Sequence, residues 1–169
     1  VPTPIMIVDT EFNVLYINKA GAAANKVTQA DMRGKRCYDF FKTGDCQTEN
    51  CACRRAMVDG RQNTSSTDAH PAGADLFIEY TGVPFRDKEG NILGAVEVVS
   101  DQTQIVKAQQ VAEKRNAYQA AEVEKLAAVL KTMANGDLRV DYEDAAGDRD
   151  TEEIRAAFSD LADALGEAL

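Results

Sequence analysis

Apolar and polar residues alternate near the start of the chain, which is the pattern of strands that bury one face of a sheet. Ile5 and Ile7 alternate with their neighbours, and Val14 and Tyr16 do the same beyond a polar turn at 9–13. The pattern predicts an antiparallel hairpin.

Strand signals return after residue 75. The segment 76–85 is rich in β-branched and aromatic residues, a polar turn follows at 87–91, and 92–99 is again apolar. These three segments predict a second hairpin.

Glycines divide the stretch between the hairpins into short helical segments, and the last of them is followed by Gly60, a residue type that commonly ends helices. The predicted short helices cover residues 20–26, 28–32, 36–41 and 50–59. Two hairpins with helices inserted between them predict an α+β fold, in which the helices cover one face of an antiparallel sheet.

From Thr103 the composition changes to Ala, Gln, Glu and Lys, with neither Pro nor Gly before Gly136, which predicts one long helix. Two apolar seams with coiled-coil spacing lie on either side of a polar connector at 136–150. Their residues are Val123, Leu126, Leu130 and Met133, then Ile154, Phe158, Leu161 and Leu165. Two such seams cannot bury their faces alone, so we expect a four-helix coiled coil formed by two chains, and hence a homodimer.

The 169 residues carry a formal net charge of −9, which is concentrated toward the C-terminus. From Asp141 onward there are ten acidic residues against two basic ones. An acidic balance argues against nucleic acid and anionic membrane surfaces as partners, because both attract Lys and Arg. No apolar run is long enough to span a bilayer and residues 1–8 lack a basic leader, so we expect a cytoplasmic fragment without direct membrane insertion.

The order of the elements in the first part of the chain resembles the PAS fold, and local motifs add to the resemblance. Pro4–Asp9 with Val14–Ala20 looks like the opening hairpin and following helix of that family. Asp31–Lys35 is similar to its h-x-G-K step, and Asp87–Gly94 is similar to its last hairpin. Ser100–Thr103 is similar to the Asp-x-Thr junction at which PAS domains lead into an output helix.

The second part of the chain resembles a HAMP domain, which consists of a helix, a connector and a parallel helix. Ala134–Leu138 matches the A-x-G-D-L that closes the first helix in that family, and Asp150–Ile154 matches the acidic D-E-h that opens the second. The resemblance divides the chain into a PAS-like sensor domain at 1–102, a linker helix at 103–116 and a HAMP-like relay domain at 117–169. The residues that it implies for signal relay are Asp101, Thr103, Gly136, Leu138, Val140 and Glu153.

A PAS domain followed by a HAMP domain is similar to the middle of methyl-accepting chemotaxis proteins and related bacterial signal transducers, some of which are membrane-anchored receptors. The resemblance implies a sensory module, not an enzyme, that relays ligand binding or redox state from the first domain to the HAMP-like bundle. Its partners would be a second copy and a downstream signalling domain or histidine kinase complex. The alternative is a ligand-free PAS module for dimerisation or docking in a sensor kinase. The sequence offers no phosphate-binding glycine loop, and no base other than His70 for a nucleophile.

Four cysteines lie in one short stretch, at Cys37, Cys46, Cys51 and Cys53. In a cytosolic protein such clustering indicates metal or redox chemistry before structural disulfides. An iron–sulfur cluster or zinc is one alternative, although the spacing lacks the usual C-x2-C pairs and Cys51 and Cys53 would diverge on a helix. A thiol–disulfide switch and inert buried cysteines are the others.

His70 and the apolar interior of the first domain are two further candidate ligand sites. His70 is the only histidine and precedes Pro71 in a polar segment, so we expect an exposed loop residue and not a haem ligand. A PAS-like interior can hold a small organic ligand, although a filled core explains the same apolar residues. The candidates for lining such a pocket are Ile7, Leu15, Phe40, Met57, Phe77, Tyr80 and Val96.

Overall fold

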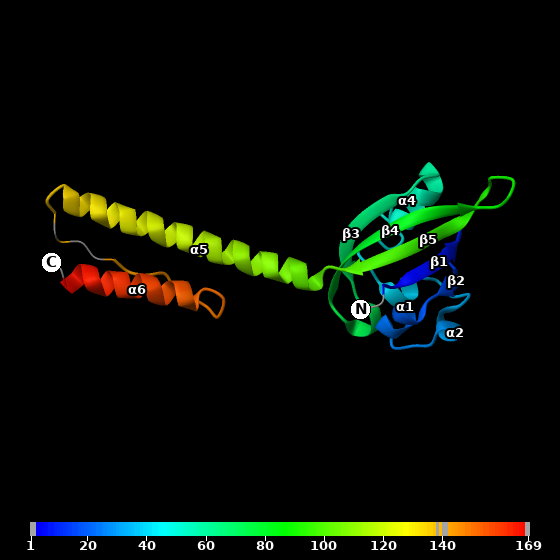
Figure 1. Ribbon diagram of the computed structural model, residues 1–169, viewed down its shortest axis with the longest axis horizontal. Coiled ribbons are helices and arrows are strands. Elements are labelled where there is room, and N and C mark those ends of the chain that lie inside the picture. The colour runs from blue at the N-terminus through cyan, green and yellow to red at the C-terminus, as the bar shows by residue number, and fades with distance from the viewer. Residues whose placement is uncertain (1–2, 138, 140–141, 168–169) are drawn as a thin grey trace. The chain divides into compact units, whose positions relative to one another are not determined.

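The computed structural model describes residues 3–137, 139 and 142–167 (Figure 1). The chain divides into two compact units, Val1–Gln104 and Ile105–Leu169. The first unit holds a β-sheet with short helices, and the second holds most of a long helix and one shorter helix.

The first unit is built on a five-stranded antiparallel sheet with the strand order β2-β1-β5-β4-β3 (Figure 1). Its strands are β1 Ile5–Asp9, β2 Val14–Ile17, β3 Asn63–Ala69, β4 Leu76–Arg86 and β5 Ile92–Asp101. The pairs β1–β2 and β4–β5 are the two predicted hairpins, and β1 also pairs with β5, which joins the hairpins into one sheet. The predicted α+β class is confirmed.

The edge strand β3 is the element that the sequence pattern does not predict. Its residues, from Asn63 to Ala69, are almost all polar, yet every one of them pairs with a residue of β4. An edge strand has one neighbour instead of two, so it can form from polar residues, with Thr favoured by its branched side chain.

Four short helices lie between β2 and β3, and one 3-10 turn lies between β3 and β4. They are α1 Lys19–Ala24, α2 Gln29–Met32, α3 Tyr38–Phe41, α4 Ala52–Asp59 and the 3-10 turn η1 Pro71–Gly73. Their ends are set by local chemistry. The Asn18 side chain accepts a hydrogen bond from the Gly21 amide at the start of α1, and Thr28 and Asp31 form a reciprocal capping box on α2. Gly60 ends α4 in the left-handed conformation, at φ 65°, as predicted for it.

The core lies between the helices and one face of the sheet. Its buried apolar residues form two clusters. The first contains Met6, Val8, Val14, Ile17, Ala22, Met32, Phe41, Cys53 and Ala95, and the second contains Ala52, Ala69, Ile78, Tyr80 and Val99. Val14 and Ile17 are three residues apart and are both buried, because the pairing of β1 with β2 shifts register between Ile7 and Val8. This irregularity leaves Tyr16 exposed, which a strict alternation does not predict.

Helix α4 approaches the sheet closely over Gly82 of β4. A Cβ atom at residue 82 would lie 2.8 Å from the carbonyl oxygen of Ala52 and equally close to the amide nitrogen of Cys53. Backbone lies against backbone here, so only a residue without a side chain fits. The close approach fixes the start of α4 on the sheet.

The second unit contains most of helix α5, Thr103–Ala134, and the whole of α6, Glu152–Glu167. Helix α5 is uninterrupted, as the absence of Pro and Gly predicts, and it ends before Gly136, which has a φ of 88°. No described helix combines the length and apolar character needed to cross a membrane. The structure contains a single chain, so the four-helix coiled coil stays a prediction.

We predict that Gly82→Ala destabilises the first unit by about 1–3 kcal/mol, because the added methyl group meets the α4 backbone, which cannot rotate away. Urea unfolding followed by circular dichroism measures the change. The same substitution at Gly166 in α6 meets nothing within 4 Å and is the control, expected to be neutral or slightly stabilising. Equal stability of the Gly82→Ala variant and the native chain would show that α4 is not in contact with β4.

Candidate functional site

The four cysteines lie around the start of helices α3 and α4, and all four are free thiols. Cys37 immediately precedes α3, Cys46 lies in the loop between α3 and α4, and Cys51 immediately precedes α4. Cys53 is in the first turn of α4. Because Cys51 has non-helical backbone angles, with φ −56° and ψ 118°, its sulfur does not diverge from that of Cys53 as a helix would require.

Three of these thiols line one cavity of about 350 Å³, which we call the thiol cavity. Its lining residues are Glu11, Phe12, Arg36, Cys37, Tyr38, Cys46, Gln47, Thr48, Cys51 and Arg54. Cys53 is not among them, and its side chain is only 1% exposed. The thiol cavity therefore presents Cys51 to a small molecule and keeps Cys53 in the core beside it.

The buried thiol of Cys53 donates a hydrogen bond to a carboxylate oxygen of Glu97 on β5, at 3.1 Å from Sγ to Oε2. Glu97 is itself buried, and this burial raises its pKa to about 7 against the opposing effect of the Cys53 hydrogen bond. In the sequence, Glu97 is the single acidic residue within the apolar run 95–99, and this was the one signal that could have identified it. A carboxyl group that titrates near neutral pH thus lies in contact with the cysteine pair.

The two thiols of α4 differ in acidity. The neighbouring Cys53 thiol is the main reason that the pKa of Cys51 falls to about 6, assisted by amide groups at the start of α4 and by the Tyr80 hydroxyl, while burial opposes the change. The same interaction raises the pKa of Cys53, and burial adds to that increase. Burial is also the main cause that raises the pKa of Cys37 and of Cys46. Cys51 is therefore the thiol of the four that is ionised at neutral pH.

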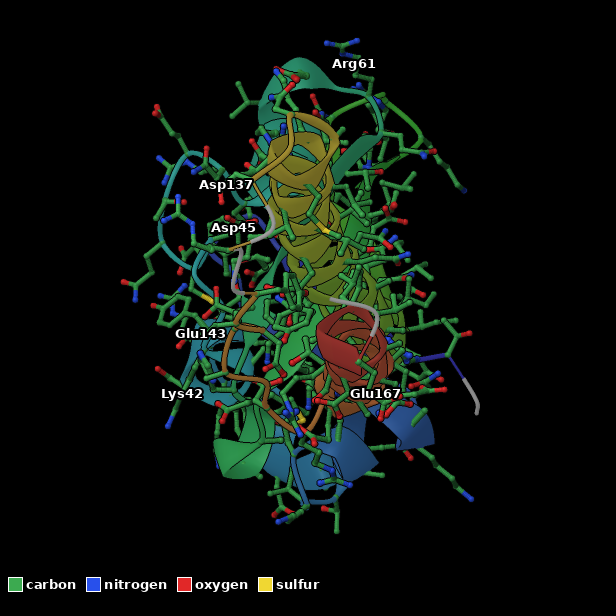
Figure 2. The ribbon with its side chains drawn as sticks, turned by 90° about the vertical axis from the view of Figure 1, so that its left-hand side faces the viewer. Lys42, Asp45, Arg61, Asp137, Glu143 and Glu167 are labelled. Carbon is green, nitrogen blue, oxygen red and sulfur yellow. The ribbon has the colours of Figure 1, made fainter. Side chains whose placement is uncertain are left out.

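Asp45 is buried, whereas the charged side chains Lys42 and Arg61 are exposed at the surface (Figure 2). It accepts hydrogen bonds from the hydroxyl groups of Tyr80, at 2.9 Å, and Ser65, at 2.6 Å. The Tyr80 hydroxyl in turn accepts from the Ala52 amide at 3.2 Å. This network ties the loop before α4 to strands β3 and β4 and holds the start of α4 in place.

The described part of the chain contains no group of three or more His, Cys, Asp or Glu side chains placed to hold a metal ion. The four cysteines are therefore not a preformed zinc or iron–sulfur site in this conformation. Cys46, for example, is engaged with Thr43, whose amide and hydroxyl groups both lie 3.2 Å from its sulfur.

A second and larger cavity, of about 740 Å³, lies where α1, α3 and η1 meet the sheet, and we call it the apolar cavity. Its lining residues are Thr3, Pro4, Lys19, Ala20, Ala23, Ala24, Phe41, Ala69, Pro71, Leu76, Ile78, Val99, Ser100 and Asp101. The lining is mostly apolar, with Lys19 and Asp101 as its charged residues, so it suits a small organic molecule.

None of the seven residues predicted to line a ligand pocket lines either cavity. Ile7 and Val96 are paired with each other, next to the buried residues Met6 and Val8, and so lie on the opposite face of the sheet. Strand periodicity gives two faces but does not say which of them the helices cover.

The other five pocket candidates lie outside the two cavities for different reasons. Leu15 and Phe77 are 43% and 39% exposed, and Phe40 and Met57 are half-buried against the core. Tyr80 is buried, but its hydroxyl group serves the Asp45 network described above. Four of the residues that line the apolar cavity are alanines, which carry little signal in a sequence.

The apolar cavity reaches the junction between β5 and α5, where two predicted relay residues lie. Asp101 lines the cavity and accepts a hydrogen bond from the Thr103 amide at 2.9 Å, and the Thr103 hydroxyl accepts one from the Phe77 amide at 3.0 Å. Asp101 therefore contacts the cavity and the first residue of α5 with the same side chain.

His70 lies between β3 and η1, as a partly exposed loop residue. Its two ring nitrogens contact the carboxylates of Asp68, at 2.7 Å, and Asp75, at 2.9 Å. The hydrogen bond to Asp68 is the largest cause that raises the pKa of His70, and the hydrogen bond to Asp75 is the next. Both ring nitrogens are occupied by carboxylates, an arrangement that gives the histidine a role in pinning this loop.

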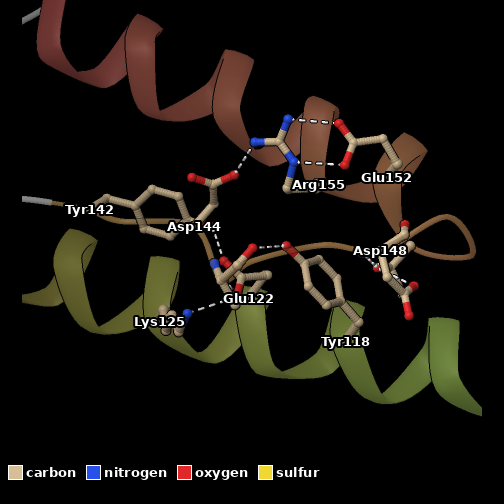
Figure 3. A network of polar contacts seen from close by, with 10 residues as sticks. Tyr118, Glu122, Lys125, Tyr142, Asp144, Asp148, Glu152 and Arg155 are labelled. Carbon is tan, nitrogen blue, oxygen red and sulfur yellow. Dashed lines mark hydrogen bonds and ion pairs between the residues drawn. The ribbon is translucent and has the colours of Figure 1, made fainter.

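In the second unit, a buried carboxylate joins the connector to α5 (Figure 3). Glu122 is 0% exposed and accepts hydrogen bonds from Lys125, Tyr142 and the Ala145 amide, at 2.8, 2.5 and 3.2 Å. Burial acts to raise the pKa of Glu122, but these donors outweigh it and lower the pKa. Glu122 is one of three acidic residues on α5, and nothing in the local sequence distinguishes it from the other two.

Further polar contacts hold the connector to both helices of the second unit (Figure 3). The Tyr118 hydroxyl donates to the Ala145 carbonyl at 2.6 Å, and Arg155 of α6 pairs with Asp144 at 2.9 Å. Glu153, a predicted relay residue, pairs with Arg115 at 2.8 Å on the surface. The predicted relay residues Leu138 and Val140 lie outside the described residues.

Comparison with known proteins identifies the family of the first unit. Residues 1–107 match the family described as the PAS fold. The PAS domain of a protein from Colwellia psychrerythraea is 17% identical, with a TM-score of 0.54, over 60% of this chain and 87% of that one. A sensory box sensor histidine kinase from Vibrio cholerae is 16% identical, with a TM-score of 0.50, over 60% and 82%. An RNA-binding light-oxygen-voltage receptor is 20% identical, with a TM-score of 0.57, over 68% and 34%. At these identities the likeness to solved structures concerns the fold alone.

We predict that Glu97 makes the first unit less stable as the pH rises. Between pH values of about 4.5 and about 7, the Glu97 carboxyl keeps a proton in the folded chain that it has lost in the unfolded chain. Above that range, the ionised carboxylate lowers the free energy of unfolding by on the order of 3 kcal/mol. Ionisation of Cys51 acts in the opposite direction above a pH of about 6, so the informative quantity is the difference between Glu97→Gln and the native chain. Urea unfolding at about pH 5 and about pH 8 should show the variant gaining stability relative to the native chain. A difference that is independent of pH would contradict the raised pKa.

Proposed function

This chain belongs to the PAS fold family, and from that premise we propose that it is a sensory and signal-transducing module of a chemotaxis-type receptor. The state of the PAS unit is relayed through α5 to a HAMP-like second unit. The proposal assigns no enzymatic activity to the chain. Free thiols at all four cysteines support a location in the reducing cytoplasm.

The observation that carries this proposal is the position of the apolar cavity. Asp101 lines the cavity and also receives the amide hydrogen bond at the start of α5, so a molecule in the cavity contacts the residue that holds the helix. A ligand that binds one orientation of this side chain better than another shifts the equilibrium between two positions of the helix start. The expected ligand is a small, mainly apolar organic molecule.

The interpretation of the second unit as HAMP-like is supported by its sequence motifs and by the exposed residues of its two apolar seams. Val123 and Leu161, which belong to the two predicted seams, are 51% and 48% exposed in the single chain, while Phe158 is buried. Half-exposed apolar side chains at heptad spacing are what a parallel bundle buries when a second copy is present. We therefore propose a homodimer, with a downstream signalling domain or histidine kinase complex as the receiver.

The second candidate function is a ligand-free docking or dimerisation module. It is favoured by the sheet face that the helices do not cover, where Tyr16, Val83 and Val98 are exposed. In that case the partner binds the sheet and the apolar cavity stays without a ligand. The two candidates are separated by the binding experiment that follows.

We predict that the full chain binds the apolar dye Nile red in the apolar cavity. Ala24→Phe should weaken binding roughly tenfold, because the ring fills space beside α1, whereas Ala30→Phe on exposed α2 is the matched control and should bind normally. Dye binding should also change hydrogen–deuterium exchange in the first turns of α5. If Val98→Thr, rather than Ala24→Phe, abolishes binding, the dye occupies the open sheet face and the docking function is favoured.

We predict that the chain is a dimer at tens of micromolar by light scattering, as its seams require. Leu161→Asp places a charge in the seam and should yield monomers without loss of the first unit's circular dichroism signal. Val58→Asp, at an exposed position of α4 outside the seams, is the control and should remain dimeric. A native chain that is monomeric at this concentration would remove the homodimer.

A further inference from the structure

Three groups in and behind the wall of the thiol cavity have no part in the ligand-binding proposal. They are the Cys51 sulfur on its wall, the Cys53 thiol behind it, and the Glu97 carboxylate that accepts the Cys53 hydrogen. We propose that Cys51 and Cys53 form a redox-active pair, in which a small hydroperoxide entering the thiol cavity oxidises Cys51 and Cys53 then closes a disulfide with it. The pair is a second input to the module, and its link to signalling rests on the proposed function.

Access and charge at the thiol cavity favour Cys51 as the attacking sulfur. The cavity of about 350 Å³ has room for a small polar molecule, and Arg36, which is paired with Glu11, and Arg54 are among its lining residues. These cations stabilise the oxyanion that leaves when an O–O bond breaks. The lowered pKa of Cys51 keeps its sulfur in the thiolate form, which is the nucleophile.

In the first step the Cys51 thiolate attacks one oxygen of the hydroperoxide. An S–O bond forms as the O–O bond breaks, so the sulfur is oxidised to a sulfenic acid and the peroxide is reduced. The departing oxyanion takes a proton from water and leaves as an alcohol, or as water when the oxidant is hydrogen peroxide.

In the second step Cys53 resolves the sulfenic acid. Its S–H proton passes to the Glu97 carboxylate, 3.1 Å away, and the resulting thiolate attacks the sulfur of Cys51. The S–S bond forms as the S–O bond breaks, and the leaving hydroxide takes the proton from Glu97 to become water. Cys53 is placed for this step because it lies two residues from Cys51, which precedes α4 on non-helical backbone, whereas the sulfur of Cys46 is held by Thr43.

The disulfide alters the contact between α4 and the sheet. It removes the hydrogen that Cys53 donates to Glu97, and it leaves a buried carboxylate without that donor. Glu97 is paired with Gly82 across β4 and β5, and Gly82 is the residue on which α4 rests. Because β5 continues to Asp101 at the start of α5, oxidation acts on the same strand as a ligand in the apolar cavity.

The test treats the reduced full chain with hydrogen peroxide and follows intact mass and peptide mapping. The native chain should lose two hydrogen masses and yield a peptide with Cys51 and Cys53 linked. Cys51→Ser should keep its remaining thiols reduced over the same time, and Cys53→Ser should stop at a sulfenic acid that dimedone traps. Val58→Ser, at an exposed position of α4 outside the thiol cavity, is the control and should form the disulfide at the native rate.

A variant that keeps all four cysteines tests whether a slower reaction of the cysteine variants is caused by misfolding. Glu97→Gln lacks the proton acceptor, so it should form the sulfenic acid at the native rate and close the disulfide at least tenfold more slowly. Oxidation of Cys51→Ser at the native rate, a disulfide between Cys37 and Cys46, or thiols that react only after a chelator removes bound metal would each overturn the proposal.

Failure of the redox pair and failure of the proposed function give different results. A Cys51–Cys53 disulfide that leaves hydrogen–deuterium exchange in α5 and α6 unchanged supports the chemistry and contradicts its link to relay. If no disulfide forms but Nile red still changes exchange in α5, the redox pair is wrong and the ligand-sensing function stands.

Discussion

The close contact of α4 with the sheet at Gly82 is the constraint on which the first unit depends. Because backbone meets backbone there, Cys53 is pressed into the core and its thiol reaches Glu97 on the neighbouring strand. The same placement puts Cys51 outside the helix, where its backbone is free to turn the sulfur toward Cys53. A polar site inside an otherwise apolar core thus follows from one glycine that lets a helix come close.

Much of the fold could be predicted from the sequence, because the two hairpins and α5 have strong periods or compositions. Strand β3 could not, since an edge strand needs no apolar face and its polar residues resemble a loop. Nor could periodicity decide that Met6 and Val8, and not Ile7, face the helices. The choice between the two faces is made by long-range packing, which a local pattern does not contain.

The candidate site was predicted only in part. The cysteines were identifiable by their clustering, but Glu97, the partner of Cys53, comes from a segment distant in sequence, and only the fold brings it near α4. Glu122 is a comparable case, because its three donors lie on α5 and on the connector. In each case a common acidic residue becomes distinctive through burial, and burial is a property of the folded chain.

Glu97 lies on a central strand, between Met6 of β1 and Gly82 of β4. A buried acid in that position lowers the stability of the sheet whenever it is ionised, and an apolar side chain of similar size would relieve the loss. Laboratory evolution that rewards heat resistance alone would consequently tend to erase this residue. Its retention in a natural sequence would then point to selection for responsiveness and not for robustness.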